Sequence, residues 1–109
     1  MATVIWTATA QVTKCNFYIQ GRMEFGIAVA NKTDLRIEEI EDDLSKWPKS
    51  GFPEPLLRGY PVLYRSRHIN KRFKLIYRYD EENDTVYIED IWDTLRSPEN
   101  LTKRMVGQQ

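Results

Sequence analysis

The spacing of apolar residues changes once along this chain of 109 residues, and the change restricts the possible folds more than any other feature. Up to Trp47 the apolar residues recur every three or four positions, which is the spacing of amphipathic helices. After Pro61 they alternate with polar residues, which is the spacing of half-buried strands. The chain is therefore predicted to be an α+β protein whose helices precede most of its sheet.

The first half of the chain predicts a strand followed by a helical hairpin. Residues 3–10 are rich in β-formers and predict the first strand. Two helices follow, the first ending near Gly21 and the second running from Met23 to Lys46, before Pro48. Their apolar stripes consist of Ala8, Val12, Cys15 and Ile19 in the first helix, and Ile27, Ala30, Thr33, Ile37, Ile40, Leu44 and Trp47 in the second. So short a link predicts that the helices run antiparallel.

The second half predicts three strands and a final helix. Proline and glycine make residues 47–61 a loop. Strands are predicted at residues 62–69, 72–80 and 85–93, joined by a two-residue turn at 70–71 and a longer turn at 81–84. Ser97 as N-cap and Pro98 at the first helical position predict a short C-terminal helix. The predicted fold is a helical hairpin packed on a mostly antiparallel four-stranded sheet, in the order β-α-α-β-β-β.

Composition indicates one small folded domain, residues 1–109. Apolar residues make up 41% of the chain, enough for a single core. The only cysteine, Cys15, excludes an internal disulfide and a cysteine-based metal cluster. The N-terminus does not look like a signal peptide, and no apolar run approaches the ~20 residues that span a membrane. We therefore expect a soluble cytoplasmic protein without a membrane partner.

Charge is balanced overall but polarised locally. The chain has 16 Lys and Arg against 16 Asp and Glu. Residues 64–79, however, hold six of these cations and no acid. Acidic blocks lie at residues 38–43 and 80–84. Because a random surface usually mixes both signs, the basic stretch suggests a site for phosphates or for an acidic partner.

Alternation along the strands predicts where these cations point. Phe73, Leu75 and Tyr77 form an apolar face that should contact the helices, which directs Lys74 and Arg78 to the opposite, outward face. If Arg65 and Arg67 share that face, four cations converge at the middle of the sheet.

The same alternation places other polar and aromatic side chains. It puts His68 and Tyr64 on the core side and sends Glu89 and Asp93 outward beside the cations, while Trp92 is expected in the core. The competing explanation is an ordinary solvated sheet face, where Lys and Arg prevent edge pairing.

The order of these segments resembles one known family. "GYPVLYRSRHI" followed by "FKLIYRYDEENDTVYIEDIWDTLRSPE" resembles the RelE/ParE superfamily of type II toxin–antitoxin toxins. The strand ending in "WT" and the long helix followed by Leu44, Pro48 and Gly51 are similar too. The resemblance implies a compact toxin fold related to microbial RNases, and a cognate antitoxin as partner.

The resemblance leaves two targets open. RelE-like members cleave mRNA on the ribosome, whereas ParE-like members poison DNA gyrase. Cleavage would use the substrate's own 2′-hydroxyl as nucleophile, without a metal or other cofactor. The arrangement of Arg65, Arg67 and Lys74 favours the nuclease. The zero net charge and the lack of a histidine and a tyrosine after the last strand support the second, binding-only role instead. A toxin that has lost its activity is a third hypothesis.

For the nuclease, the resemblance implies roles for specific residues. Arg65 and Arg67 would position the phosphate, and Lys74 with Arg96 would stabilise the charge of the transition state. Asp93 stands where many relatives have histidine, so Asp93 or Glu89 could be the base, although either could simply pair with a cation. Further substrate contacts are expected from Lys71, Arg72 and Arg78. The antitoxin is expected to contact the hairpin and the cationic face, with the acidic block 38–43 as a docking surface for its basic residues.

Overall fold

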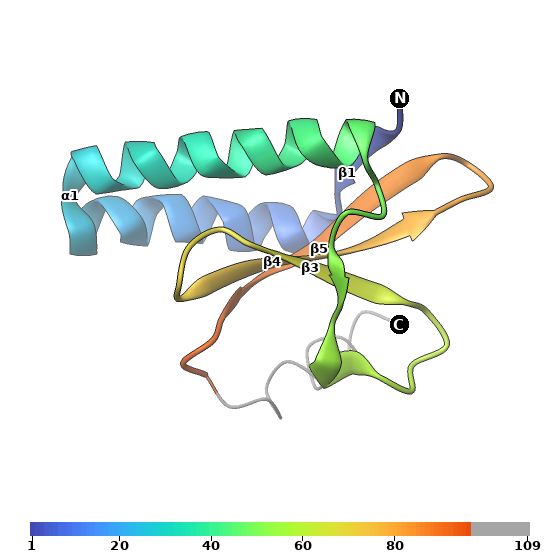
Figure 1. Ribbon diagram of the computed structural model, residues 1–109. Helices are drawn as coiled ribbons and strands as arrows, with labels where there is room; N and C mark the ends of the chain where they lie inside the picture. Colours follow the sequence, from blue (N-terminus) through green and yellow to red (C-terminus); the bar gives the residue numbers. More distant parts are fainter. Residues whose placement is uncertain (97–109) are drawn as a thin grey trace.

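The computed structural model describes residues 1–96, which form a sheet with a helical hairpin on one face (Figure 1). The elements are β1 (Thr3–Trp6), α1 (Ala8–Lys46), β2 (Phe52–Pro53), the 3₁₀ turn η1 (Pro55–Leu57), β3 (Tyr64–His68), β4 (Phe73–Asp80) and β5 (Thr85–Asp93). The α+β class and the hairpin-on-sheet arrangement are confirmed. The helix predicted from Ser97 lies outside the described residues.

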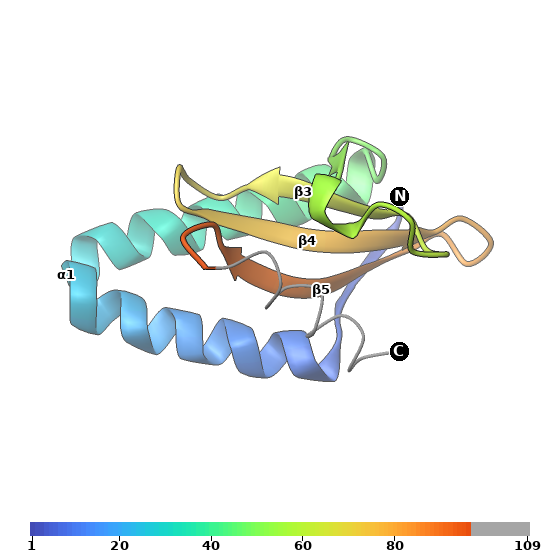
Figure 2. The ribbon, with the colours of Figure 1, turned by 90° about the horizontal axis from the view of Figure 1, so that it is seen from below.

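The two predicted helices are the arms of α1, and they meet at Gly26. This residue has φ of 83°, a left-handed conformation that glycine adopts without the steric cost of a side chain. The arms, residues 8–25 and 27–46, run antiparallel (Figures 1 and 2) and are joined by an ion pair of 3.1 Å between Arg22 and Asp34. The predicted break between Gly21 and Met23 is therefore wrong by about one turn, whereas the predicted end at Lys46 is confirmed.

The sheet has five strands in the order β1-β5-β4-β3-β2. The β1–β5 pair is parallel, and the other three pairs are antiparallel, so the mostly antiparallel prediction is confirmed. The predicted count of four is corrected by β2, a two-residue edge strand inside the predicted loop. The first strand is shorter than predicted, because the side chain of Thr7 accepts a hydrogen bond from the backbone N–H of Ala10 and begins the helix.

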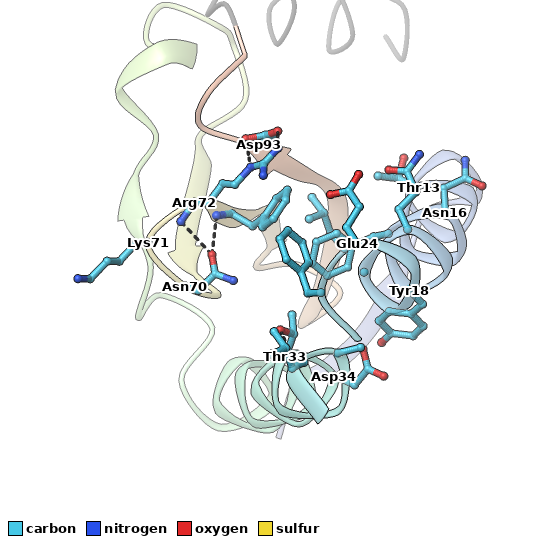
Figure 3. Close-up of a pocket in the computed structure, with 18 of the residues that line it drawn as sticks. Thr13, Asn16, Tyr18, Glu24, Thr33, Asp34, Asn70, Lys71, Arg72 and Asp93 are labelled. Carbon is cyan, nitrogen blue, oxygen red and sulfur yellow. Dashed lines mark hydrogen bonds and ion pairs between the residues drawn. The ribbon is translucent and has the colours of Figure 1, made fainter. Parts of the chain in front are cut away.

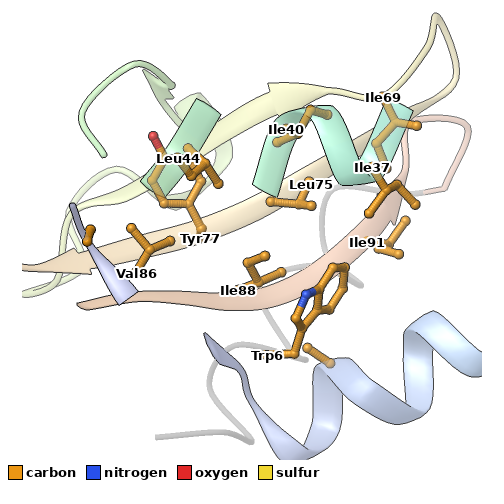
Figure 4. Close-up of a cluster of buried hydrophobic side chains, with 12 residues drawn as sticks. Trp6, Ile37, Ile40, Leu44, Ile69, Leu75, Tyr77, Val86, Ile88 and Ile91 are labelled. Carbon is orange, nitrogen blue, oxygen red and sulfur yellow. The ribbon is translucent and has the colours of Figure 1, made fainter. Parts of the chain in front are cut away.

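The main core lies between the arms and the sheet (Figure 4). It consists of Ala2, Trp6, Ala10, Ile37, Ile40, Leu44, Ile69, Leu75, Tyr77, Val86, Ile88 and Ile91. The second arm packs the predicted middle of its stripe, Ile37, Ile40 and Leu44, against the strands. The predicted stripe of the first arm is wrong, because Val12 and Ile19 are exposed and Ala10 and Phe17 pack inward instead.

A second, smaller core lies on the outward face of the sheet. It consists of Leu57, Tyr64, Ile76 and Trp92, with Leu56 and Tyr60 partly buried against it. The segment that carries η1 lies on the side of the sheet away from the arms (Figures 1 and 2). Tyr64 and Trp92 were both expected in the helix-side core, and both predictions are wrong. The outward face is thus partly apolar rather than a wet cationic surface.

Gly51, in the segment after α1, packs closely against β3 and β4. A Cβ at this position would lie 2.6 Å from Tyr77 Oη and 2.9 Å from Ser66 O. We expect Gly51→Ala to lower the free energy of unfolding by about 1–3 kcal/mol, since overpacking forces the neighbours apart. Urea unfolding measures this change.

Gly21→Ala is the matched control for that experiment. It lies within α1 with no atom within 4 Å of its added Cβ. Alanine should therefore stabilise the helix by about 0.5–1 kcal/mol. A Gly51→Ala protein as stable as the parent would contradict the close packing of Tyr77 and Ser66 around Gly51.

Candidate functional site

The turn between β3 and β4 decides which cations share a face. The predicted two-residue turn at 70–71 would have paired Arg67 with Lys74. In the structure β4 begins at Phe73, and Lys74 pairs with His68. The side-chain oxygen of Asn70 accepts from the backbone N–H groups of Arg72 and Phe73, both at 2.9 Å, which holds the longer turn. A shift of one residue moves every side chain of a strand to the other face.

Arg65 and Arg67 consequently lie on the helix side. They pair across the sheet with Tyr77 and Leu75, which belong to the main core. Arg65 donates to Gly51 O at 2.9 Å. The prediction that these two arginines join Lys74 on an open face is wrong.

Arg67 holds the chain after α1 in a similar way. Its guanidinium donates to Ser50 Oγ at 2.9 Å and pairs with the Asp43 carboxylate at 3.1 Å. Both arginines therefore fasten residues 43–51 to β3, which is a structural role.

Lys74 lies on the outward face as predicted, and its partner is Glu54. Lys74 Nζ lies 2.7 Å from Glu54 Oε1, and the side chains are 12% and 0% exposed. The second carboxylate oxygen, Oε2, is buried and has no hydrogen-bond partner among the described residues. Burial of an incompletely satisfied carboxylate is unfavourable, so its retention requires an explanation beyond stability.

Sequence reasoning missed Glu54, although a signal was present. It is the only acidic residue between Asp43 and Asp80. It stands between Pro53 and Pro55, at the cap of η1, where its Oε1 also accepts from Leu56 N at 3.3 Å. A lone acid in a long basic and apolar stretch is a candidate partner for the nearby cations.

His68 completes a group of three ionisable side chains. Because it pairs with Lys74 across β3 and β4, it lies on the same outward face, and it is exposed. The expectation that it points into the core is therefore wrong, for the same reason of register. We call Glu54, Lys74 and His68 the outward triad. It brings a carboxylate, an ammonium and an imidazole to one face of the sheet.

Arg78 occupies the same face farther along β4, as predicted. Its Nε lies 2.9 Å from Glu89 Oε1, and its guanidinium stacks over the Tyr87 ring at 4.1 Å. The register of β4 with β5 shifts between Ile76 and Tyr77, which leaves Glu89 as an extra residue of β5. Glu89 therefore lies beside a cation as expected, although its partner is Arg78.

The bulge turns Asp93 to the helix side, against prediction. It pairs across the sheet with Phe73, and its carboxylate accepts two hydrogen bonds from Arg72, at 3.0 and 2.8 Å. The hydrogen bond from Arg72 holds the pKa of Asp93 below its usual value, against the opposing effect of burial. A carboxylate stabilised in its ionised form in this way is a poor base.

Asp93 and Arg72 line a cavity of about 740 Å³ between the two arms and the β3–β4 turn (Figure 3). Lys71 and Arg96 also line it. Four residues predicted for the nuclease site thus meet here, away from the outward triad. Nearby, burial and, to a smaller extent, the Asp34 carboxylate raise the pKa of Tyr18 to about 12.

Residues 1–96 offer neither a cluster of metal ligands nor a membrane-spanning helix. No group of three or more His, Cys, Asp or Glu side chains in this part of the chain could hold a metal ion. None of the helices in the same part is long and apolar enough to cross a membrane.

Comparisons with known proteins identify the fold. No protein-family model and no curated protein sequence matches this chain. Solved structures do match. The chromosomal ParDE toxin–antitoxin system of P. aeruginosa gives a TM-score of 0.65 at 20% identity, over 85% of this chain and 96% of that chain.

Two other toxins have similar structures. The YoeB/ParE toxin of Agrobacterium tumefaciens gives a TM-score of 0.59 at 18% identity, over 84% of this chain and 96% of that one. The isolated RelE toxin of E. coli gives 0.56 at 15% identity, over 96% and 99%. The chain therefore has the fold of RelE/ParE toxins, as the sequence resemblance predicted.

The Arg72–Asp93 pair makes a prediction about pH. Because the pKa of Asp93 is lower in the folded than in the unfolded chain, its contribution to stability is present above the unfolded value of about 3.9 and is lost as pH falls through the folded value. We expect Asp93→Asn and Arg72→Gln to weaken the fall in unfolding free energy between about pH 5 and pH 2. Urea unfolding across that range measures it. Profiles as steep as that of the parent would contradict the assignment.

Proposed function

We propose that this chain is the toxin of a type II toxin–antitoxin pair and cleaves mRNA in a ribosome-dependent manner. The observation that carries the proposal is the buried Glu54–Lys74 pair beside His68 on the outward face, in which Glu54 Oε2 has no hydrogen-bond partner within the described part of the chain. The shared fold with proteins described as ParDE, YoeB/ParE and RelE toxins supports the toxin class.

The outward triad contains the groups that metal-independent RNA cleavage requires. The 2′-hydroxyl attacks the adjacent phosphorus, and the bond to the 5′-oxygen of the next nucleotide breaks, leaving a 2′,3′-cyclic phosphate and a 5′-hydroxyl. Glu54 Oε2 would accept the 2′-hydroxyl proton, and His68 would donate a proton to the departing 5′-oxygen. Lys74 would stabilise the extra negative charge on the phosphate oxygens.

These roles revise the assignments made from sequence. Lys74 keeps its role, and Glu54 replaces Asp93 as the base. Arg65 and Arg67 are assigned a structural role instead of a catalytic one. Because the Glu54 side chain has no exposed surface, substrate binding has to uncover it before it can act. The closed arrangement of the outward triad is thus that of the substrate-free protein.

Phe52 is the proposed contact for a base of the substrate. It is 80% exposed and pairs with Ser66 across the sheet, which places it on the outward face two residues before Glu54. An exposed aromatic ring can stack on any nucleobase, at about 1–3 kcal/mol per base. The strands therefore place a stacking surface next to the proposed chemistry.

Substitution of the triad tests the chemistry. We expect Glu54→Gln to reduce mRNA cleavage by about 10²–10⁴-fold, since the proton acceptor is lost. The measurement is the mapping of mRNA 5′ ends after induction, where the parent should cut inside translated frames. Growth arrest with an unchanged mRNA profile would contradict the nuclease hypothesis.

Folding and chemistry can be separated with a double variant. Removal of one partner of the buried pair leaves an uncompensated charge and costs up to about 3–5 kcal/mol of stability. Glu54→Gln with Lys74→Met removes both charges and should recover most of that stability while remaining inactive. If the double variant regained cleavage together with stability, the pair would be structural only.

A gyrase-directed toxin is the second candidate, and the ion pairs favour it. Four of the cations between residues 64 and 79 are already paired, namely Arg67, Lys74, Arg78 and Arg72. A surface whose cations are neutralised by its own carboxylates is better suited to a protein than to RNA phosphates. Supercoiling and DNA-breakage assays with purified gyrase distinguish this candidate.

Either target implies a cognate antitoxin. Antitoxin segments that fold on binding would cover apolar surface and compete with existing ion pairs. The exposed acids Glu38, Glu39 and Asp42 on the second arm remain a proposed contact for its basic residues. A pull-down with the product of the neighbouring reading frame tests the pairing.

A further inference from the structure

The first arm of α1 is apolar on two opposite sides. Its inner side packs Ala10 and Phe17 against the sheet. Its other side carries an exposed row of apolar residues, which we call the outer stripe and which consists of Ala8, Val12, Cys15, Ile19 and Met23. Val12, Ile19 and Met23 are 63%, 56% and 82% exposed. A helix with apolar residues on opposite sides is usually covered on both.

The outer stripe is continuous, and the one charged side chain at its edge is Arg22, three residues after Ile19. Its members follow one another at intervals of four, three, four and four residues, so they share one face of the helix over about 22 Å. The polar residues along its borders, Gln11, Asn16 and Gln20, are uncharged. The nearby Arg22 is already paired with Asp34 of the other arm.

The spacing of the outer stripe is also nearly symmetric about its centre. With a two-fold axis between positions 15 and 16, Ala8 of one copy lies opposite Met23 of the other, and Val12 lies opposite Ile19. Each large side chain then faces a smaller one, which is the arrangement that lets two helices interdigitate. Cys15 lies next to the axis and faces the same region of the second helix.

We infer that the outer stripe packs antiparallel against the same stripe of a second copy of this chain. An interface of this symmetry places the same patch on both partners, so the patch must complement itself. The borders meet this condition, since Arg22 is paired with Asp34 and would lie opposite Thr9 of the second copy, so that no like charges are brought together. By contrast, the second arm exposes Glu38, Glu39 and Asp42, which would repel their own copies.

The small contact area sets the expected strength. Specific interfaces typically bury about 800 Å² on each partner, and five side chains along about 22 Å of helix bury less. We therefore expect a dimer that forms with increasing protein concentration rather than a permanent one. This inference does not depend on the proposed function.

Sedimentation and thiol cross-linking test the dimer directly. The parent should shift from monomer to dimer with increasing concentration, and a short bismaleimide should join two chains through Cys15, the only thiol. Ile19→Asp should weaken association at least tenfold, since it brings two like charges into the apolar contact. Cys15→Ser should lose the cross-link and keep the concentration-dependent dimer.

Leu35→Asp is the matched control, because Leu35 is 58% exposed on the other arm. It should leave association unchanged. Circular dichroism shows whether each variant is folded. A parent that stays monomeric at all concentrations would overturn the inference and leave the outer stripe to a different partner. Equal loss of association in both variants would overturn it as well, because the contact would not be specific to the outer stripe.

Discussion

The register between β3 and β4 is the constraint on which the arrangement of charges depends. It is set by a turn in which Asn70 accepts two backbone hydrogen bonds and begins β4 one residue later than a two-residue turn would allow. That single residue turns Arg65 and Arg67 toward the helices and brings His68 beside Lys74. A functional surface on a sheet thus depends on a hydrogen-bonded turn at its end.

The bulge in β5 has a comparable effect on the pairing of β4 with its other neighbour. Because Glu89 is inserted between two paired residues, the residues that follow change sides. Trp92 therefore packs in the outward core, and Asp93 joins Arg72 at the cavity. The two faces have become chemically different, one with a large apolar core and the other with a small core flanked by paired charges.

These pairs explain why a strongly basic stretch does not produce a strongly basic surface. Lys74 and Arg78 are each held by a carboxylate that comes from a different segment, Glu54 from the chain before η1 and Glu89 from β5. The pairing lowers the electrostatic cost of placing cations near an apolar cluster. It also leaves one buried carboxylate oxygen of Glu54 without a hydrogen-bond partner among residues 1–96.

The sequence by itself determined the α+β class, the helical hairpin, the end of the long helix before Pro48 and the antiparallel order of the last three strands, because apolar spacing and proline geometry act locally. Only the tertiary structure decided which side of β3, of the end of β5 and of the first arm of α1 is buried. Strand parity depends on turn length and on a bulge, and the first arm has apolar residues on two sides, of which Ala10 and Phe17 face the sheet. Glu54 lies far from Lys74 in the sequence, so a contact between them required the folded sheet.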